Sequence, residues 1–129
     1  MSKKKAKKKM FRIPVDVWRT DILVCSGDSY DKAIATYIKK FGLEDKGLSS
    51  TDEVTDYTIA RTFTTKATKG VGIWYRCGVP PLGVIAHESA HAANHILQVS
   101  GVSFSEESEE AYTYLLDYIV TETVKKLYY

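Results

Sequence analysis

His87-Glu88-Ser89-Ala90-His91 lies inside a run of residues whose apolar spacing predicts an α-helix. Residues four apart in a helix lie one turn apart on the same face, so the imidazoles of His87 and His91 can point at one zinc ion. Glu88 lies about 100° further round the helix, close to such an ion but poorly placed to bind it. That position suits a base that acts on a metal-activated water molecule.

Glycine and proline residues bound this motif helix. The segment Gly78-Val79-Pro80-Pro81 ends a preceding strand and starts the helix, because proline is tolerated in a first helical turn. Gly101 is expected to end the helix near Ser100. On the helical wheel, apolar residues cluster opposite His87, so one face packs on a sheet while the other carries the histidines. These core-facing residues are Ile85, Ala92, Ile96 and Val99.

The sequence before the motif helix predicts strands and one covering helix. Residues 11–18 are expected to be extended, and residues 21–28 form a continuous apolar run, the pattern of a strand buried on both faces. Residues 57–63 and 71–77 are rich in strand formers, with a hairpin loop over 64–70 and a polar loop in 43–56. Ser29 or Asp28 caps the covering helix, and Gly42 ends it. Its apolar residues are Ala33, Ile34, Tyr37, Ile38 and Phe41.

A last helix is expected from about residue 106 to the C-terminus, because Ser103-Phe104-Ser105-Glu106 resembles a capping box. These elements predict an α+β fold, a small mixed or antiparallel sheet packed against the covering helix, the motif helix and a C-terminal helix that carries glutamates. A chain of 129 residues supports a single such domain, which we expect over residues 11–129. The apolar face of the last helix consists of Ala111, Tyr112, Leu115, Leu116, Ile119, Val120, Val124 and Leu127.

A catalytic zinc site usually has three protein ligands and a water molecule, so the third ligand identifies the class. A metzincin would have glycine at position 94 and histidine at position 97, but the chain has Asn94 and Leu97. The other common arrangement uses a glutamate from the next helix. Four glutamates open that helix, namely Glu106, Glu107, Glu109 and Glu110.

Glu110 is the preferred third ligand, because it shares a stripe of the helix with the polar residues Tyr114 and Asp117. Glu109 instead shares its face with core residues such as Leu116, where an unpaired carboxylate would be costly. Two alternatives stay open. Glu109 could be the ligand, or the glutamates could only favour the positive end of the helix dipole.

The motif and its continuation resemble gluzincin-type zinc metallopeptidases, in which a His-Glu-x-x-His helix is followed by a helix with a glutamate ligand. Residues 87–93 and 109–119 are similar to small single-domain zinc peptidases encoded by bacteriophages and prophages, and the likeness covers roughly residues 80–121. It implies a minimal zincin-like domain with a Zn²⁺ cofactor and a peptide or protein substrate. It also implies that a strand just before the motif helix holds the substrate, here Val71, Gly72, Ile73, Trp74 and Tyr75.

Three further residues are candidates for supporting roles at this site. Asp117 lies seven residues after Glu110, whereas larger gluzincins have an aspartate at four, so it is only a candidate to orient a histidine ring. Tyr114 could donate a hydrogen bond to an oxyanion, although a packing role is the simpler interpretation. His95 is too far along the helix to share an ion with His87, so it is a surface or outer-shell residue.

The charge of +2 divides unevenly along the chain. The first nine residues hold six of the 18 basic side chains, and the remaining 120 residues carry a net charge of −4. Residues 1–10 therefore form a basic tail, expected to be disordered and at most a weak contact for nucleic acid. No apolar segment follows the lysines as in a signal peptide, and no run is long enough to span a membrane. Cys25 and Cys77 are then expected to be reduced and buried in a cytoplasmic protein.

Two functions from different classes are consistent with these residues. The first is a zinc-dependent peptidase in which Glu88 acts as general base. The second is a non-catalytic module that contains zinc and binds a host or phage protein, since so short a chain has little material for a deep cleft. A nucleic-acid-binding function rests on the lysine tail alone and is not favoured. The oligomeric state is left open by the sequence.

Overall fold

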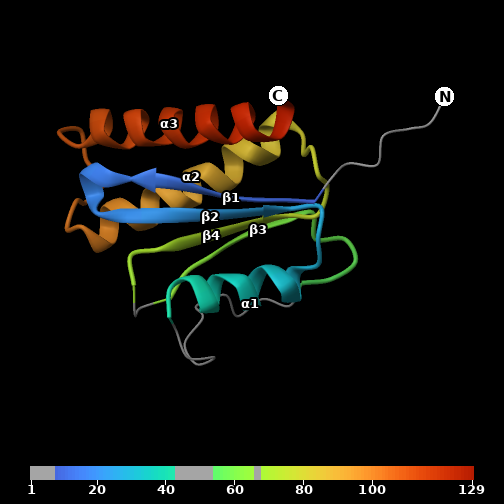
Figure 1. Cartoon of the computed structure of the whole chain (residues 1–129). Coiled ribbons are helices and arrows are strands. Elements are labelled where there is room, and N and C mark those ends of the chain that lie inside the picture. Colours follow the sequence, from blue (N-terminus) through green and yellow to red (C-terminus); the bar gives the residue numbers. More distant parts are fainter. Residues whose placement is uncertain (1–7, 43–53, 66–67) are drawn as a thin grey trace.

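The computed structural model describes residues 8–42, 54–65 and 68–129, and these residues form one sheet covered by helices on both faces (Figure 1). The fold is α+β, as the sequence predicts. The strands are β1 (Lys9–Val15), β2 (Thr20–Ser26), β3 (Ala60–Phe63) and β4 (Val71–Tyr75). The helices are η1 (Asp16–Trp18), a short 3₁₀ turn, and α1 (Tyr30–Lys40), α2 (Leu82–Val99) and α3 (Glu109–Tyr128).

The sheet is mixed, with the order β1-β2-β4-β3. β1 and β2 form an antiparallel hairpin around η1, and Arg19 closes that turn in the left-handed conformation with a φ of 54°. β2 runs parallel to β4, and β3 returns antiparallel to β4. The two central strands are apolar on both faces, which is why the run from Ile22 to Cys25 is buried throughout.

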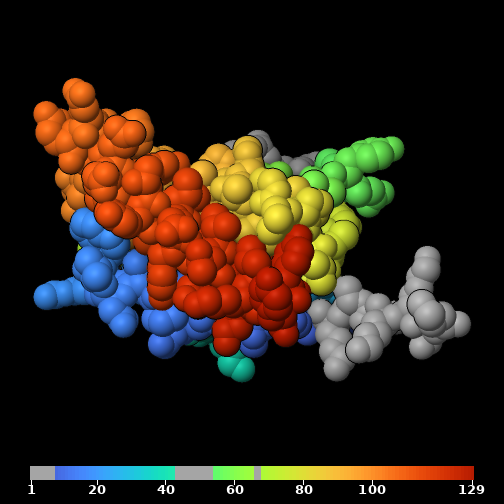
Figure 2. All heavy atoms as spheres, turned by 90° about the horizontal axis from the view of Figure 1, so that it is seen from above, coloured from blue at the N-terminus to red at the C-terminus, as the bar shows by residue number. Residues whose placement is uncertain are grey.

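Helices α2 and α3 cover one face of the sheet, and α1 covers the other (Figure 1). Seen from above, α3 lies across this face beside α2 (Figure 2). The side chains of β2 and β4 alternate between the two layers, so each strand contributes to both cores. The α1 side buries Leu23, Cys25, Ala33, Tyr37, Phe63 and Trp74. The other side buries, among others, Ile22, Val24, Ile73, Ile85, Ile96 and Ile119.

The predicted limits of the motif helix are confirmed. Pro81 is the N-cap of α2, and Gly101 has a φ of 82°, so it ends the helix in a conformation that glycine adopts readily. The amide of Val102 donates to the carbonyl of Leu97 at 2.8 Å, which closes the end of the helix. One core assignment is wrong, because Val99 in the last turn is 43% exposed.

The start of the last helix differs from the prediction. α3 begins at Glu109, and Ser108 is its N-cap without a side-chain capping bond. The Ser108 hydroxyl instead donates to the carbonyl of Ser103, and the Ser105 amide donates to that same hydroxyl at 2.8 Å. These bonds stabilise a separate turn, so the capping box with Glu106 does not form. The predicted apolar face is confirmed, because each of its eight residues belongs to the core or packs against it.

Other boundaries also shift. β1 begins at Lys9, so the last two residues assigned to the basic tail belong to the sheet. Residues 1–7 lie outside the described residues, as does the loop predicted at residues 47–51 within the polar 43–56 segment. β4 ends at Tyr75, and Cys77 is exposed rather than buried. Cys25 is buried, as predicted. Within the described residues, no helix combines the length and the apolar character needed to cross a membrane.

Candidate metal centre

Helix α2 brings the two motif histidines together on an exposed face. The Nε2 atoms of His87 and His91 are 3.2 Å apart, and the rings lie edge to face with centroids 4.8 Å apart. Nitrogens bound to tetrahedral zinc at about 2.0–2.1 Å lie about 3.4 Å from each other. The observed spacing is therefore close to what two ligands of one zinc ion require.

Glu88 points away from solvent, toward β3. It is 7% exposed, and its Oε1 accepts a hydrogen bond of 2.9 Å from the hydroxyl of Thr62. The Thr62 oxygen also lies 3.1 Å from the main-chain carbonyl of Glu88, so its single proton is shared between two acceptors. The other carboxylate oxygen, Oε2, lies 3.9 Å from Nε2 of His87. One oxygen is thus held by Thr62 of the sheet, while the other lies near His87.

The alternation of β3 explains the position of Thr62. Neighbouring residues of a strand point to opposite faces, and Phe63 is buried in the α1 core. Thr62 therefore points to the opposite face, where α2 packs. It pairs with Ile73 of β4, a residue buried in the core on the α2 side.

A second polar group lies beneath the motif. Tyr75, at the end of β4, is fully buried, and its hydroxyl has no hydrogen-bond partner in the described part of the chain. Burial raises the pKa of Tyr75 well above its usual range, the charge of Glu88 raises it further, and the Ser89 hydroxyl opposes the shift. Tyr75 therefore stays protonated at neutral pH, as a buried donor under the acidic residue of the motif.

The third ligand is not brought to the histidines. Among the described residues, no three His, Cys, Asp or Glu side chains are close enough to hold a metal ion together. Helices α2 and α3 pack against each other in opposite directions (Figure 1). Tyr112 of α3 lines the same small hollow as Asn94 of α2. Glu109 and Glu110 are less than one turn before Tyr112, so they lie further toward the C-terminal end of α2 than His91 does.

The supporting residues also take different places. Asp117 is exposed and accepts a weak hydrogen bond of 3.4 Å from the Thr121 hydroxyl. Tyr114 is 70% exposed and lines a hollow with residues 14–18, on a side of α3 to which α2 contributes no residue. His95 is half-buried, burial lowers its pKa, and its buried Nε2 has no partner in the part of the chain that the structure describes.

The predicted substrate strand is wrong for a structural reason. The predicted residues form β4, which pairs with β2 on one edge and with β3 on the other. They are Val71, Gly72, Ile73, Trp74 and Tyr75. A strand whose two edges are paired has no ladder of hydrogen-bonding groups left for an extended substrate. All five residues are also buried, so β4 belongs to the core of the sheet.

Thr62 is the residue of the centre that sequence reasoning missed. It lies in a run correctly predicted to be a strand, but no local pattern links it to a helix 26 residues later. The sequence signal for this role is a polar threonine on the strand face opposite Phe63. That signal does not show that Glu88 is the hydrogen-bond partner of Thr62.

Comparison with known proteins finds no matching family model, curated relative or solved structure. The gluzincin resemblance therefore rests on the motif residues, and any function must be argued from the geometry around His87, Glu88 and His91.

Proposed function

We propose that the chain is a zinc-dependent peptidase whose centre is built on α2. The observation that carries this proposal is the pair of Nε2 atoms 3.2 Å apart, next to a glutamate whose second oxygen lies 3.9 Å from Nε2 of His87. Two histidines placed by chance on one helix face would not require a neighbouring carboxylate to be buried and held by another element. A general base does require such positioning.

The donor set around the motif fits zinc in part. Imidazole nitrogens are common zinc ligands, and His87 and His91 are exposed enough for an ion and a substrate to reach them. Glu110 remains the proposed third ligand and Glu109 the alternative, and either would need the first turn of α3 to approach α2. The peptidase activity, its peptide or protein substrate, a phage or prophage origin and a cytoplasmic setting are all part of this proposal.

The chemistry follows from the positions of the side chains. Zinc, when bound, would supply Lewis-acid activation of a water molecule and of the scissile carbonyl. Glu88 would accept the proton of the attacking water at Oε2 and later pass it to the leaving amine. Thr62 would keep Oε1 occupied, so that the carboxylate presents the same oxygen in each cycle.

The test is zinc content and peptidase activity measured on the same preparations. The wild-type protein should bind one zinc ion per chain, and His91→Ala should lose it. Glu88→Gln should keep the zinc and lose the activity, since an amide cannot accept the proton. The proposal is wrong if folded wild-type protein binds no zinc when zinc is supplied, or if Glu88→Gln leaves a zinc-dependent activity unchanged.

A non-catalytic binding module is the second candidate, and one observation favours it. An apolar hollow lies between η1 and α3, away from the histidines, with a volume of about 470 Å³. Such a hollow could bind a protein partner whether or not the metal centre is catalytic.

A further inference from the structure

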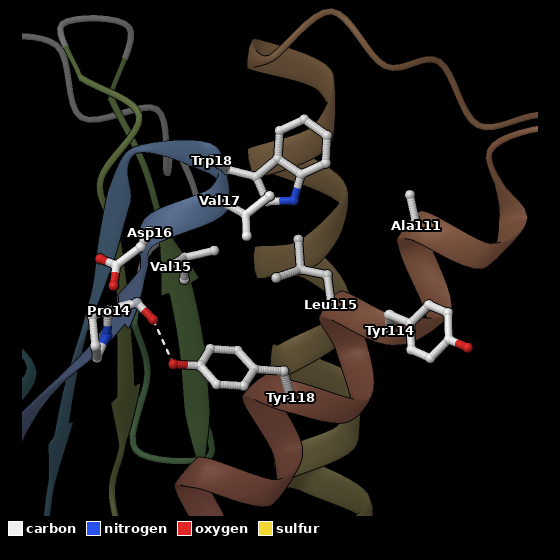
Figure 3. A pocket seen from close by; sticks show the side chains of 9 residues that line it. All are labelled: Pro14, Val15, Asp16, Val17, Trp18, Ala111, Tyr114, Leu115 and Tyr118. Carbon is white, nitrogen blue, oxygen red and sulfur yellow. Dashed lines mark hydrogen bonds between the residues drawn. The ribbon is translucent and has the colours of Figure 1, made fainter.

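The hollow beside α3 is a groove with an apolar floor and aromatic walls (Figure 3). Leu115 forms part of its floor and is 5% exposed, whereas Val17 and Tyr114 at its margins are 86% and 70% exposed. The volume of about 470 Å³ falls in the range of about 300–1,000 Å³ typical of ligand sites. Exposed apolar side chains around a buried apolar floor are a common feature of binding sites.

Two polar groups of the groove differ in their hydrogen bonding. The Tyr118 hydroxyl donates to the carbonyl of Pro14 at 2.5 Å, which ties α3 to β1 and closes one end of the groove (Figure 3). The indole N–H of Trp18 points toward α3 and has no hydrogen-bond partner among the residues that the structure describes (Figure 3). The wall therefore offers one free donor, suited to a carbonyl oxygen.

The margin of the groove is acidic. Asp16 is the carboxylate among its lining residues, and Asp117 lies on α3 less than one turn after Tyr114; neither carboxylate has an ion-pair partner in the described ranges. Glu122, one turn after Tyr118, is paired with Lys125 at 3.3 Å. Arg19, the residue that follows η1, adds one positive charge, but Asp16, Asp117 and Arg19 together still carry a net negative charge. Besides burial, the charges of Glu122 and Asp16 raise the pKa of Tyr118, and Lys125 opposes them.

We propose that this groove binds a basic segment of a partner protein, with one large apolar side chain in the hollow and lysine or arginine residues on either side. The apolar side chain would rest on Leu115 between the rings of Trp18 and Tyr118. A main-chain carbonyl of the segment would accept from the Trp18 indole, and its cations would meet Asp16 and Asp117. The proposal uses none of His87, Glu88, His91 and Glu110, and it holds whether or not the protein is a peptidase.

A basic peptide fits these features better than other ligands do. A purely apolar ligand would leave the indole donor and the carboxylates unused, and an acidic ligand would be repelled. Charged groups beside an apolar pocket favour a partner that carries the complementary charges around an apolar anchor.

The experiment uses a capped pentapeptide of four lysines with a central leucine, and follows the emission of Trp18. Only Trp18 lines the groove, because Trp74 is buried at 1% exposure beneath α1. The leucine peptide should shift the emission until the shift saturates with peptide concentration. A peptide with alanine in the centre should bind at least about tenfold more weakly. Tyr114→Ala and Asp16→Asn should each weaken binding several-fold. The matched controls are Tyr57→Ala, at a tyrosine that is 93% exposed elsewhere, and Asp31→Asn on α1.

Each other outcome overturns the proposal. Equal binding of a peptide with glutamates in place of lysines, or no effect of the two groove variants, would remove the groove as a basic-peptide site. Equal binding of hexylammonium would point to a small amphipathic cation. A concentration-dependent dimer that is lost both in Asp16→Asn and on deletion of residues 1–7 would identify the chain's own basic segment as the occupant. Zinc content measured on Tyr114→Ala and Asp16→Asn, neither of which changes a proposed ligand, separates any of these failures from a failure of the peptidase proposal.

Discussion

The hydroxyl of Thr62 donates to Oε1 of Glu88 across 2.9 Å, and this bond joins β3, an edge strand of the described sheet, to the motif helix. The carboxylate is buried on the β3 side and faces His87 on the other. A buried carboxylate without such a donor is costly, so this bond both stabilises the fold and fixes the orientation of the Glu88 carboxylate.

Thr62→Val tests this relationship, because valine keeps the shape of threonine and removes the hydroxyl. The free energy of unfolding should fall by about 1–3 kcal/mol. Thr62→Ser keeps the hydroxyl, so it should retain most of the stability that the bond contributes. In a double-mutant cycle with Glu88→Ala, which removes the acceptor, the two changes measured by chemical denaturation should be non-additive. Additive effects would show that the two residues do not depend on each other. Zinc binding should survive in Thr62→Val, since both histidines remain.

Local sequence patterns account for most of the fold. Glycine residues end α1 and α2, a serine caps α1, and a continuous apolar run forms β2. Each of these features depends on residues within a few positions of one another. Here Ser29 accepts from the amide of Lys32 at 3.2 Å, as a cap should. Such features are decided by neighbouring residues, so they can be predicted from one chain.

The failures involve relations between distant segments. The order β1-β2-β4-β3 makes β4 an interior strand. The uninterrupted apolar run of residues 71–75 indicates burial on both faces, but it does not show that both edges of the strand are paired. The distance of Glu110 from His91 depends on where α3 begins, and the turn built by Ser108 moves that start to Glu109. The closeness of His87 and His91 was predictable because both lie on one helix, whereas the position of a glutamate relative to them depends on the packing of two helices.

Gly72 should be intolerant of a side chain. A Cβ at this position would lie 2.1 Å from the ring of Phe63, which is itself buried at 1% exposure. Gly72→Ala should therefore lower the free energy of unfolding by about 1–3 kcal/mol, the usual cost of overpacking. The matched control is Gly83→Ala in α2, where a Cβ meets nothing within 4 Å. That change should be neutral or stabilise by up to about 1 kcal/mol, because alanine favours helix.

Stability should fall at high pH through Cys25. Burial raises the pKa of its thiol from 9.0 to about 11, and the nearby Asp28 contributes. The folded state therefore holds this proton more tightly than the unfolded state, so the stabilising contribution is complete below pH 9 and is lost as the pH rises to about 11. Denaturation midpoints measured from pH 8 to 11 should show a smaller decline in Cys25→Ala than in the wild type. Equal declines would assign the effect to other groups, such as Tyr37.

The identity of the third ligand can be measured through the stability that zinc adds. A ligand that binds only the folded state at 100 times its dissociation constant stabilises it by about 2.7 kcal/mol. Glu110→Gln should reduce this gain, because an amide is a poorer zinc ligand than a carboxylate. Glu109→Gln and the control Glu106→Gln should leave the gain unchanged, and all three substitutions remove the same charge near the start of α3. A loss confined to Glu109→Gln would assign the ligand to Glu109. An undiminished gain in all three would mean that neither glutamate binds, and that zinc can be held without moving α3 toward His91.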